Sequence, residues 1–201
     1  WYAVLELKNK IWPLIKKEIP EAEIHIYGAY ITPKAMQLNN IKEGFIIKGR
    51  AENSENVFKN AKVLLAPLPF GAGIKGKLLE SMLFGTPNIT SSIGAEGMQL
   101  SEKWNGFIED DFIQFAKRAI ELYKNTDIWK NAQQNGFNII RKNFNKSQFE
   151  LEFQNKIYDL ENNFETYRKD NFMGQILQHH LHKSTYYMSK WIEEKNKTNH
   201  E

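Results

Sequence analysis

The 201-residue sequence contains no cysteine, which excludes disulfide bridges and metal sites built on thiolate ligands. It also has no apolar run long enough to cross a membrane, because runs such as residues 63–68 (VLLAPL) are short. No secretory signal segment is recognisable. We therefore expect a cytoplasmic protein, with or without peripheral contact at the inner face of the membrane.

The sequence also lacks a strong charge bias, because 27 basic residues face 24 acidic ones and give a net charge of +3. A nucleic-acid-binding domain normally carries a much larger basic excess, so we expect no nucleic-acid partner. A site for one anionic small molecule is compatible with this charge. Hydrophobic residues make up 41% of the chain and charged residues 25%, a globular composition that argues against wholesale disorder.

Strand-like and helix-like patterns alternate in the first half of the chain, which predicts an α/β fold with a Rossmann-like parallel sheet flanked by helices. The apolar run at 62–68 is typical of a strand covered on both faces. We expect one domain over residues 1–164 and a C-terminal helical extension over residues 165–201. The other expected strands are 22–28, 44–50, 86–92 and a brief piece at 105–110. The expected helices are 2–18, 32–38, 54–61, 75–84, 110–124, 126–143, 146–164 and 169–196.

The loops that follow the expected strands should lie at one edge of the sheet, where open α/β proteins bind ligands. One of them, in the stretch PFGAGIKGKLLESMLFG, carries Gly71, Gly73 and Gly76 beside Lys75 and Lys77. Glycines let a ligand approach the backbone, and the start of a helix offers unpaired N–H groups and a partial positive charge. Together with the lysines, these features suit a phosphate or diphosphate.

A single carboxylate, Glu80, follows one helical turn beyond this loop. A carboxylate repels phosphates but accepts hydrogen bonds from neutral hydroxyls, such as those of a ribose. The alternative is a tight turn followed by a solvated pair of Lys77 and Glu80, worth about 0.2–0.5 kcal/mol. The loop lacks the ending of a P-loop, and no acid ends the next strand as in a dinucleotide site. Spacing alone leaves both interpretations open. Four apolar residues of the helix are expected to face the sheet: Leu78, Leu79, Met82 and Leu83.

Several stretches taken together resemble the C-terminal domain of GT-B glycosyltransferases, above all the large retaining group called family 4 or glycosyl transferases group 1. They are HIYGAY, GFIIKGRAENSENVFKNAKVLLAPLPFGAGIKGKLLESMLFGTPNITSSIGAEGM and the helices that follow. The order of a G-R strand, an apolar strand ending in proline, the glycine loop, K-x-L-E-x-M-x-x-G-x-P and G-x-E-G carries the likeness. It implies that the chain is a single half of a GT-B fold, which binds a nucleotide-diphospho-sugar donor.

The resemblance also implies which residues bind the donor. Gly49 and Arg50, at the end of the G-R strand, would lie by the nucleotide base. The backbone amides of Gly71, Gly73 and Ile74 would meet the sugar and the diphosphate.

Glu80 would take the ribose hydroxyls, and Lys75 and Lys77 are the implied catalytic residues, because they would stabilise the leaving diphosphate. Most family members carry another glutamate eight positions before the one that corresponds to Glu80, and this chain has Ala72 there. The chain instead resembles a subset with the pattern G-x-G-x-R/K-x-K-x-L-E. The departure leaves the contact to the donor sugar undefined.

The implied donor is a UDP-, GDP- or ADP-sugar, with no cofactor and no metal. The implied acceptor is a glycan or a lipid-linked molecule of cell-envelope biosynthesis. A GT-B enzyme also needs an N-terminal acceptor domain, which 201 residues do not contain, and its donor domain has a further strand expected before Trp1. We therefore expect the parent protein to be a hexosyltransferase-type enzyme and this chain alone to be inactive.

The C-terminal extension allows a function of another class. Its apolar residues could pair two chains, in a non-catalytic α/β module that dimerises through its C-terminal helices. A membrane-surface helix and a sugar-nucleotide epimerase of similar fold are further alternatives. His179, His180 and His182 fan around the helix axis without a cysteine or an acidic partner, so we expect no metal site there.

Overall fold

The computed structural model describes residues 1–98 and 102–198, apart from the side chains at 148, 179–182 and 198. The chain divides into two compact units, Trp1–Asn145 and Lys146–Glu201. The boundary that we expected between residues 164 and 165 therefore lies inside the second unit. The helix that starts at Lys146 contacts the helix that follows it, and this contact assigns it to the C-terminal unit.

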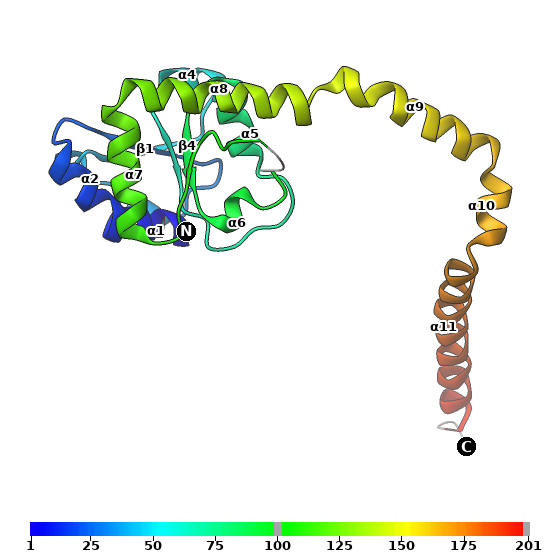
Figure 1. Ribbon diagram of the computed structural model, residues 1–201. Coiled ribbons are helices and arrows are strands. Elements are labelled where there is room, and N and C mark those ends of the chain that lie inside the picture. Colours follow the sequence, from blue (N-terminus) through cyan, green and yellow to red (C-terminus); the bar gives the residue numbers. More distant parts are fainter. Residues whose placement is uncertain (99–101, 199–201) are drawn as a thin grey trace. The chain divides into compact units, whose positions relative to one another are not determined.

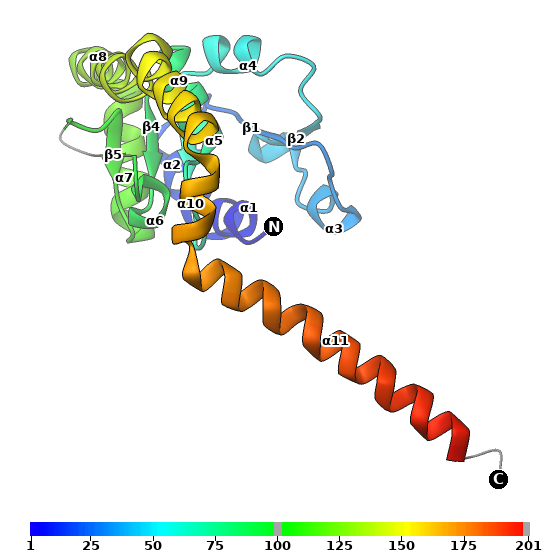
Figure 2. The same ribbon diagram turned by 90° about the vertical axis from the view of Figure 1, so that its right-hand side faces the viewer.

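Strands of the first unit form two parallel sheets among the described residues, which confirms the expected parallel α/β class. In one sheet, β1 (Ile24–Tyr27) pairs with β2 (Phe45–Gly49). In the other, β4 (Asn88–Thr90) lies between β3 (Leu64–Ala66) and β5 (Gly106–Ile108). Figure 2 shows β1 and β2 on one side of this unit and β4 and β5 on the other.

Burial of the strands differs from our expectation. The run 62–68 was expected to be covered on both faces, but β3 spans only its central residues and all three are half-buried. The fully buried strand is β4, although it contains the polar residues Asn88 and Thr90. The reason is position, because β4 has a strand on each side and three helices against it.

The first helix of the chain is continuous over the predicted range. It comprises α1 (Tyr2–Glu6), a π-helical turn η1 (Leu7–Ile11) and α2 (Trp12–Glu18). A stripe of apolar side chains at helical spacing is buried along it and explains why this segment folds as an amphipathic helix. The stripe consists of Leu7, Ile11, Trp12 and Ile15.

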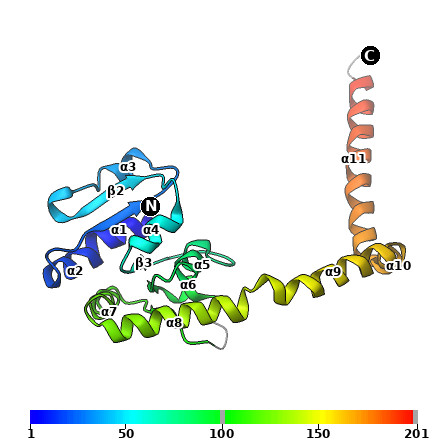
Figure 3. The same cartoon turned by 90° about the horizontal axis from the view of Figure 1, so that it is seen from above.

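Two hydrophobic cores hold the first unit together. The larger core joins both sheets, because Ile24 and Phe45 of one sheet and Ile89 of the other pack in the same cluster. The smaller core lies between α5 and α8, which pack against each other (Figures 1 and 3). The remaining helical segments are α3 (Pro33–Met36), η2 (Ile41–Glu43), α4 (Ser54–Asn60), α5 (Gly76–Leu83), α6 (Ser92–Ala95), α7 (Phe112–Lys124) and α8 (Thr126–Asn143).

The second unit consists of α9 (Lys146–Asn162), α10 (Phe164–Asp170) and α11 (Phe172–Thr198). We expected one helix over 169–196, but α11 begins at Phe172. Asn171 separates it from α10, because its Oδ1 accepts a hydrogen bond from the amide of Gly174 at 2.9 Å. No helix in residues 1–98 and 102–198 is both long and apolar enough to span a bilayer.

Candidate functional site

The glycine loop connects the carboxyl end of β3 to α5, as the sequence predicted. Its base is held by Thr90, the last residue of β4, and by Ser91, whose hydroxyl groups donate to carbonyls at the end of β3 and at the start of the loop. Thr90 Oγ1 lies 2.8 Å from the carbonyl oxygen of Ala66, and Ser91 Oγ lies 2.6 Å from that of Leu68. The loop therefore starts from a fixed point at the sheet edge.

Beyond this base the loop is open. Gly73 has a left-handed backbone with φ of +63°, and a Cβ placed there or at Gly76 would meet no atom of the described residues within 4 Å, apart from the adjoining backbone. The neighbouring side chains of Phe70 and Ile74 are 70% and 57% exposed. The backbone at Gly73 and Gly76 is thus accessible, whereas at Gly71 the side chain of Lys75 lies close, with its Cε 3.3 Å from the position of a Cβ.

The start of α5 also differs from that of neighbouring helices. Lys75 occupies the N-cap position, and no side chain of the described residues caps the helix there. Because the first amides of a helix have no partner within it, this end can donate to a ligand. Side chains cap α3, α4, α6, α7 and α8, namely Thr32, Asn53, Ser91, Asp111 and Asn125.

Lys75 connects the glycine loop to a second loop. Its Nζ donates to the carbonyl oxygen of Glu96 at 3.4 Å, so the segment after α6 lies beside the start of α5. Gly97 in that segment has φ of +74°, and a Cβ placed there would meet no atom within 4 Å among the described residues beyond its chain neighbours. The motif G-x-E-G was visible in the sequence, but we did not predict Glu96 as a neighbour of the site.

Lys77 and Glu80 lie on the same side of α5 and form an ion pair. The Nζ of Lys77 is 3.0 Å from Oε2 of Glu80, and the two side chains are 72% and 33% exposed. This is the surface pair that the sequence allowed as an alternative. It leaves the carboxylate accessible one turn inside the helix, so both interpretations agree with the geometry.

Gly49 and Arg50 lie at the end of β2, in the other sheet. Gly49 is left-handed with φ of +87°, and its carbonyl accepts a hydrogen bond from the amide of Gly28 at 2.8 Å. Arg50 is exposed. The structure thus brings Lys75 to Glu96 and Lys77 to Glu80, while Gly49 and Arg50 belong to a separate loop pair.

The face of α5 that packs on the sheet differs from the predicted one. Leu78 and Met82 are buried as expected, but Leu83 is half exposed, and the polar Ser81 is fully buried in its place. Asn88 of β4 and Trp104 complete a buried polar group behind the helix. This group was not predicted, and its one signal in the sequence was Asn88 within the expected strand 86–92.

The described residues contain no cluster of three His, Asp or Glu side chains that could hold a metal ion. The structure does not describe the side chains of His179, His180 and His182, so the expectation for these residues lies outside the described part of the chain.

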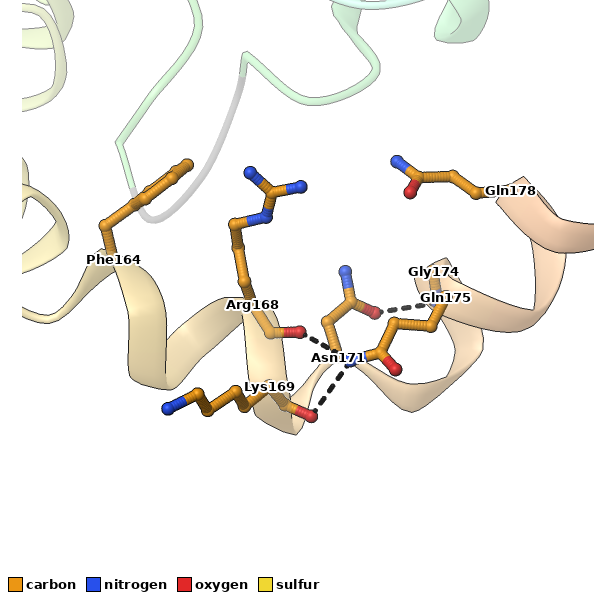
Figure 4. A pocket seen from close by; sticks show the side chains of 7 residues that line it. All are labelled: Phe164, Arg168, Lys169, Asn171, Gly174, Gln175 and Gln178. Carbon is orange, nitrogen blue, oxygen red and sulfur yellow. Dashed lines mark hydrogen bonds between the residues drawn. The ribbon is translucent and has the colours of Figure 1, made fainter.

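The second unit has a pocket of about 350 Å³ between α10 and α11 (Figure 4). Gln175 closes one side, because its Nε2 donates to the carbonyl oxygens of Arg168 and Lys169. None of the residues predicted to bind a donor lines it. The lining consists of Phe164, Arg168, Lys169, Asn171, Gly174, Gln175 and Gln178.

One known protein family matches most of the first unit. The family model "Glycosyl transferases group 1" matches residues 2–125, from α1 to the end of α7. Among curated proteins, the chain is similar to the "Uncharacterized 44.6 kDa protein in cps region" of Klebsiella pneumoniae. The two are 26% identical over 155 residues, which cover 74% of this chain and 39% of that protein.

Two solved structures share the fold. One is S. aureus TarM, as a variant in complex with Fondaparinux, alpha-GlcNAc-glycerol and UDP, with a TM-score of 0.64 and 17% identity. The other is the pneumococcal O-GlcNAc transferase GtfA in complex with UDP and GlcNAc, with a TM-score of 0.62 and 18% identity. They cover 75% and 77% of this chain, which spans 32% of each of those chains.

Proposed function

Because this chain belongs to the glycosyl transferases group 1 family, we propose that it is the donor-binding part of a retaining glycosyltransferase. The donor is a nucleotide-diphospho-sugar, and the acceptor is a glycan or lipid-linked molecule of the cell envelope, modified on the cytoplasmic side. The order of the G-R strand, the glycine loop and K-x-L-E-x-M-x-x-G-x-P supports a GT-B enzyme of the family 4 type. An acceptor domain outside this sequence completes the enzyme.

The observation that carries the proposal is the open glycine loop in front of the uncapped start of α5. The amides of Gly71, Gly73 and Ile74 can surround a diphosphate whose negative charge is also attracted to Lys75 and Lys77. In the reaction, the bond between the anomeric carbon and the diphosphate oxygen breaks, and its electron pair stays on the diphosphate. Positive charge and amides placed there stabilise the leaving group in the transition state.

The nucleoside end of the donor binds to groups that suit neutral hydroxyls and a base, unlike the amides and lysines at the diphosphate. Glu80 accepts hydrogen bonds from the ribose hydroxyls, each worth about 1.5–3 kcal/mol for a charged acceptor. Gly49 and Arg50 contact the base. The acceptor hydroxyl forms the new bond to the anomeric carbon, and its proton passes to the diphosphate oxygen that has gained the electron pair, so the proposed step includes no metal.

The nucleotide in the two related structures supports a UDP-sugar within this class, because both hold UDP. A thermal-shift screen of UDP-, GDP- and ADP-sugars against the chain identifies the base. We expect the largest stabilisation with the UDP compounds.

Calorimetry with UDP then tests the site. Glu80→Gln removes the charge that accepts the ribose hydroxyls, and we expect the affinity for UDP to fall tenfold or more. The matched control is Glu152→Gln, because Glu152 forms a similar exposed pair with Lys156 at 2.7 Å in the second unit. Equal affinity of the Glu80 variant and the control would remove Glu80 from the site.

A second candidate function is supported by the C-terminal helices. They lie outside the residues matched by the family model, and α11 exposes large apolar side chains such as Phe172, Leu177, Met188 and Trp191. A non-catalytic module that pairs with a second copy through α11 would bury them. It predicts no nucleotide binding and a concentration-dependent dimer, seen by sedimentation, that is lost when residues after 168 are deleted.

A further inference from the structure

A chain of hydrogen bonds runs along the buried side of α5. The indole Nε1 of Trp104 donates to Oδ1 of Asn88 at 2.9 Å, and Nδ2 of Asn88 donates to Oγ of Ser81 at 2.9 Å. Oγ of Ser81 in turn donates to the carbonyl oxygen of Leu78 at 2.7 Å. Ser81 and Asn88 are fully buried, and Trp104 nearly so.

The chemistry of these side chains allows the bonds to run in one direction only. An indole nitrogen can only donate, so the carbonyl oxygen of Asn88 must face Trp104. The amide nitrogen of Asn88 must then face Ser81, which accepts with its oxygen and donates its hydrogen to the helix backbone. If α5 rotated, the side-chain amide of Asn88 would lose the Ser81 oxygen that accepts its hydrogen bond and would stay buried. The surrounding cluster includes Leu78, Met82, Ala95, Met98 and Ile139.

Asn88 and Trp104, at the far end of this series of hydrogen bonds, are held independently of the helix. Asn88 lies in β4, which pairs with a strand on each side, and its backbone amide donates to the carbonyl oxygen of Asn105 at 2.7 Å. Trp104 is held as well, since its carbonyl accepts from Nδ2 of Asn135 of α8 at 3.2 Å. The hydrogen bonds to the central strand β4 therefore fix how α5 is rotated about its own axis.

Ser81 directly follows Glu80, and neighbouring residues of a helix point about 100° apart. When Ser81 is held on the buried side, Glu80 is directed to the open side, beside Lys77. We propose that Asn88 is a positioning residue, which holds Ser81 and so aims the Glu80 carboxylate at the ribose of the donor. This inference rests on the proposed function and names a part of the site that the motifs do not contain.

The experiment compares the affinities of UDP and 2′-deoxy-UDP for the full 201-residue chain, by ligand-observed NMR titration up to millimolar ligand. Glu80 and the ribose hydroxyls make the difference between the two probes, whereas the glycine loop binds both alike. We expect the unaltered chain to prefer UDP about tenfold. Ser81→Ala and, separately, Asn88→Leu should reduce this preference to less than threefold while 2′-deoxy-UDP binds as before.

Two further variants separate positioning from a general loss of stability. Ile139→Val trims the same core without touching the hydrogen bonds, and it should lower the unfolding midpoint but keep the tenfold preference. Adding Ser81→Ala to Glu80→Gln should reduce the preference no further than Glu80→Gln alone, because Ser81 acts through Glu80.

The outcomes distinguish this inference from the proposed function. If the unaltered chain binds neither probe, or binds both equally, the proposed role of Glu80 fails and the inference fails with it. If the unaltered chain prefers UDP and both Ser81→Ala and Asn88→Leu keep that preference, the inference alone is overturned.

Discussion

The ammonium group of Lys77 contacts both carboxylate oxygens of Glu80, with Nζ 3.1 Å from Oε1 and 3.0 Å from Oε2. Both side chains reach solvent, so water screens their attraction and the pair contributes little to folding stability. A diphosphate at the glycine loop can therefore attract Lys77 at small cost. The freed carboxylate can then accept hydroxyl groups.

Lys77→Met tests this division of roles. We expect the affinity for UDP to fall about tenfold at low salt and less at high salt, because the lost attraction is screened by ions. The free energy of unfolding should change by less than about 0.5 kcal/mol, as is usual for an exposed site. Titrations of UDP at two salt concentrations measure the effect. Uridine, which carries no phosphate, is the control ligand, and an equal loss for uridine would argue against a diphosphate contact.

Two loop glycines should respond differently to alanine. Gly76→Ala fits the backbone and the open space, so it should stabilise the protein by about 0.4–1 kcal/mol. Gly73→Ala places a side chain at φ of +63° and should destabilise it by about 1–2 kcal/mol. Both methyl groups would occupy the approach to the loop amides, so both variants should bind UDP more weakly. Chemical unfolding and calorimetry on the same samples check this, and undiminished binding by both would place the ligand elsewhere.

Gly94 is required by close packing at the foot of the site. A Cβ there would lie 1.9 Å from Oγ1 of Thr90, the hydroxyl that donates to the carbonyl oxygen of Ala66. We expect Gly94→Ala to lower the free energy of unfolding by about 1–3 kcal/mol, as overpacking does. Adding Thr90→Ala removes two of the three close atoms, Oγ1 and Cγ2, and leaves the Cβ at 3.0 Å, so it should recover part of the loss in urea unfolding. A single variant as stable as the parent would contradict the close approach.

Removal of the second unit tests which part of the chain carries the site. The two hydrophobic cores lie within residues 4–144, so a chain that ends at Asn145 should keep its unfolding midpoint. It should also keep its preference for UDP over 2′-deoxy-UDP and lose any self-association. Circular dichroism, the NMR titration and sedimentation measure these three properties. Loss of the folded state would show that the C-terminal helices are part of the domain.

Local patterns predicted most helices and the positions of the five strands in the part of the chain that the structure describes, because each rests on residues close in sequence. The stripe from Leu7 to Ile15 and the turn signals around the glycine loop are of this kind. Which strand is central was not predictable from the same patterns. The apolar run at β3 is more hydrophobic than β4, yet β4 is buried, since burial depends on strand pairing and helix packing between distant segments.

In the candidate site, too, local features were predicted and contacts between distant segments were not. Lys75, Lys77 and Glu80 were recognised because their spacing around the start of one helix is local. The contact of Lys75 with the carbonyl of Glu96 and the bonds of Asn88 to Ser81 and Trp104 were not. These contacts join residues 7 to 21 positions apart, on elements whose relative placement no short motif describes.

By itself, the sequence determined the parallel α/β class, the family resemblance and the set of charged groups around the glycine loop, because these follow from local periodicity and short spacings. Only the tertiary structure decided that β4 is the buried strand and that the loop is open. It also decided that a buried serine, rather than a leucine, faces the sheet beside Glu80. The physical reason is that burial and the satisfaction of buried hydrogen bonds are settled between segments distant in the chain.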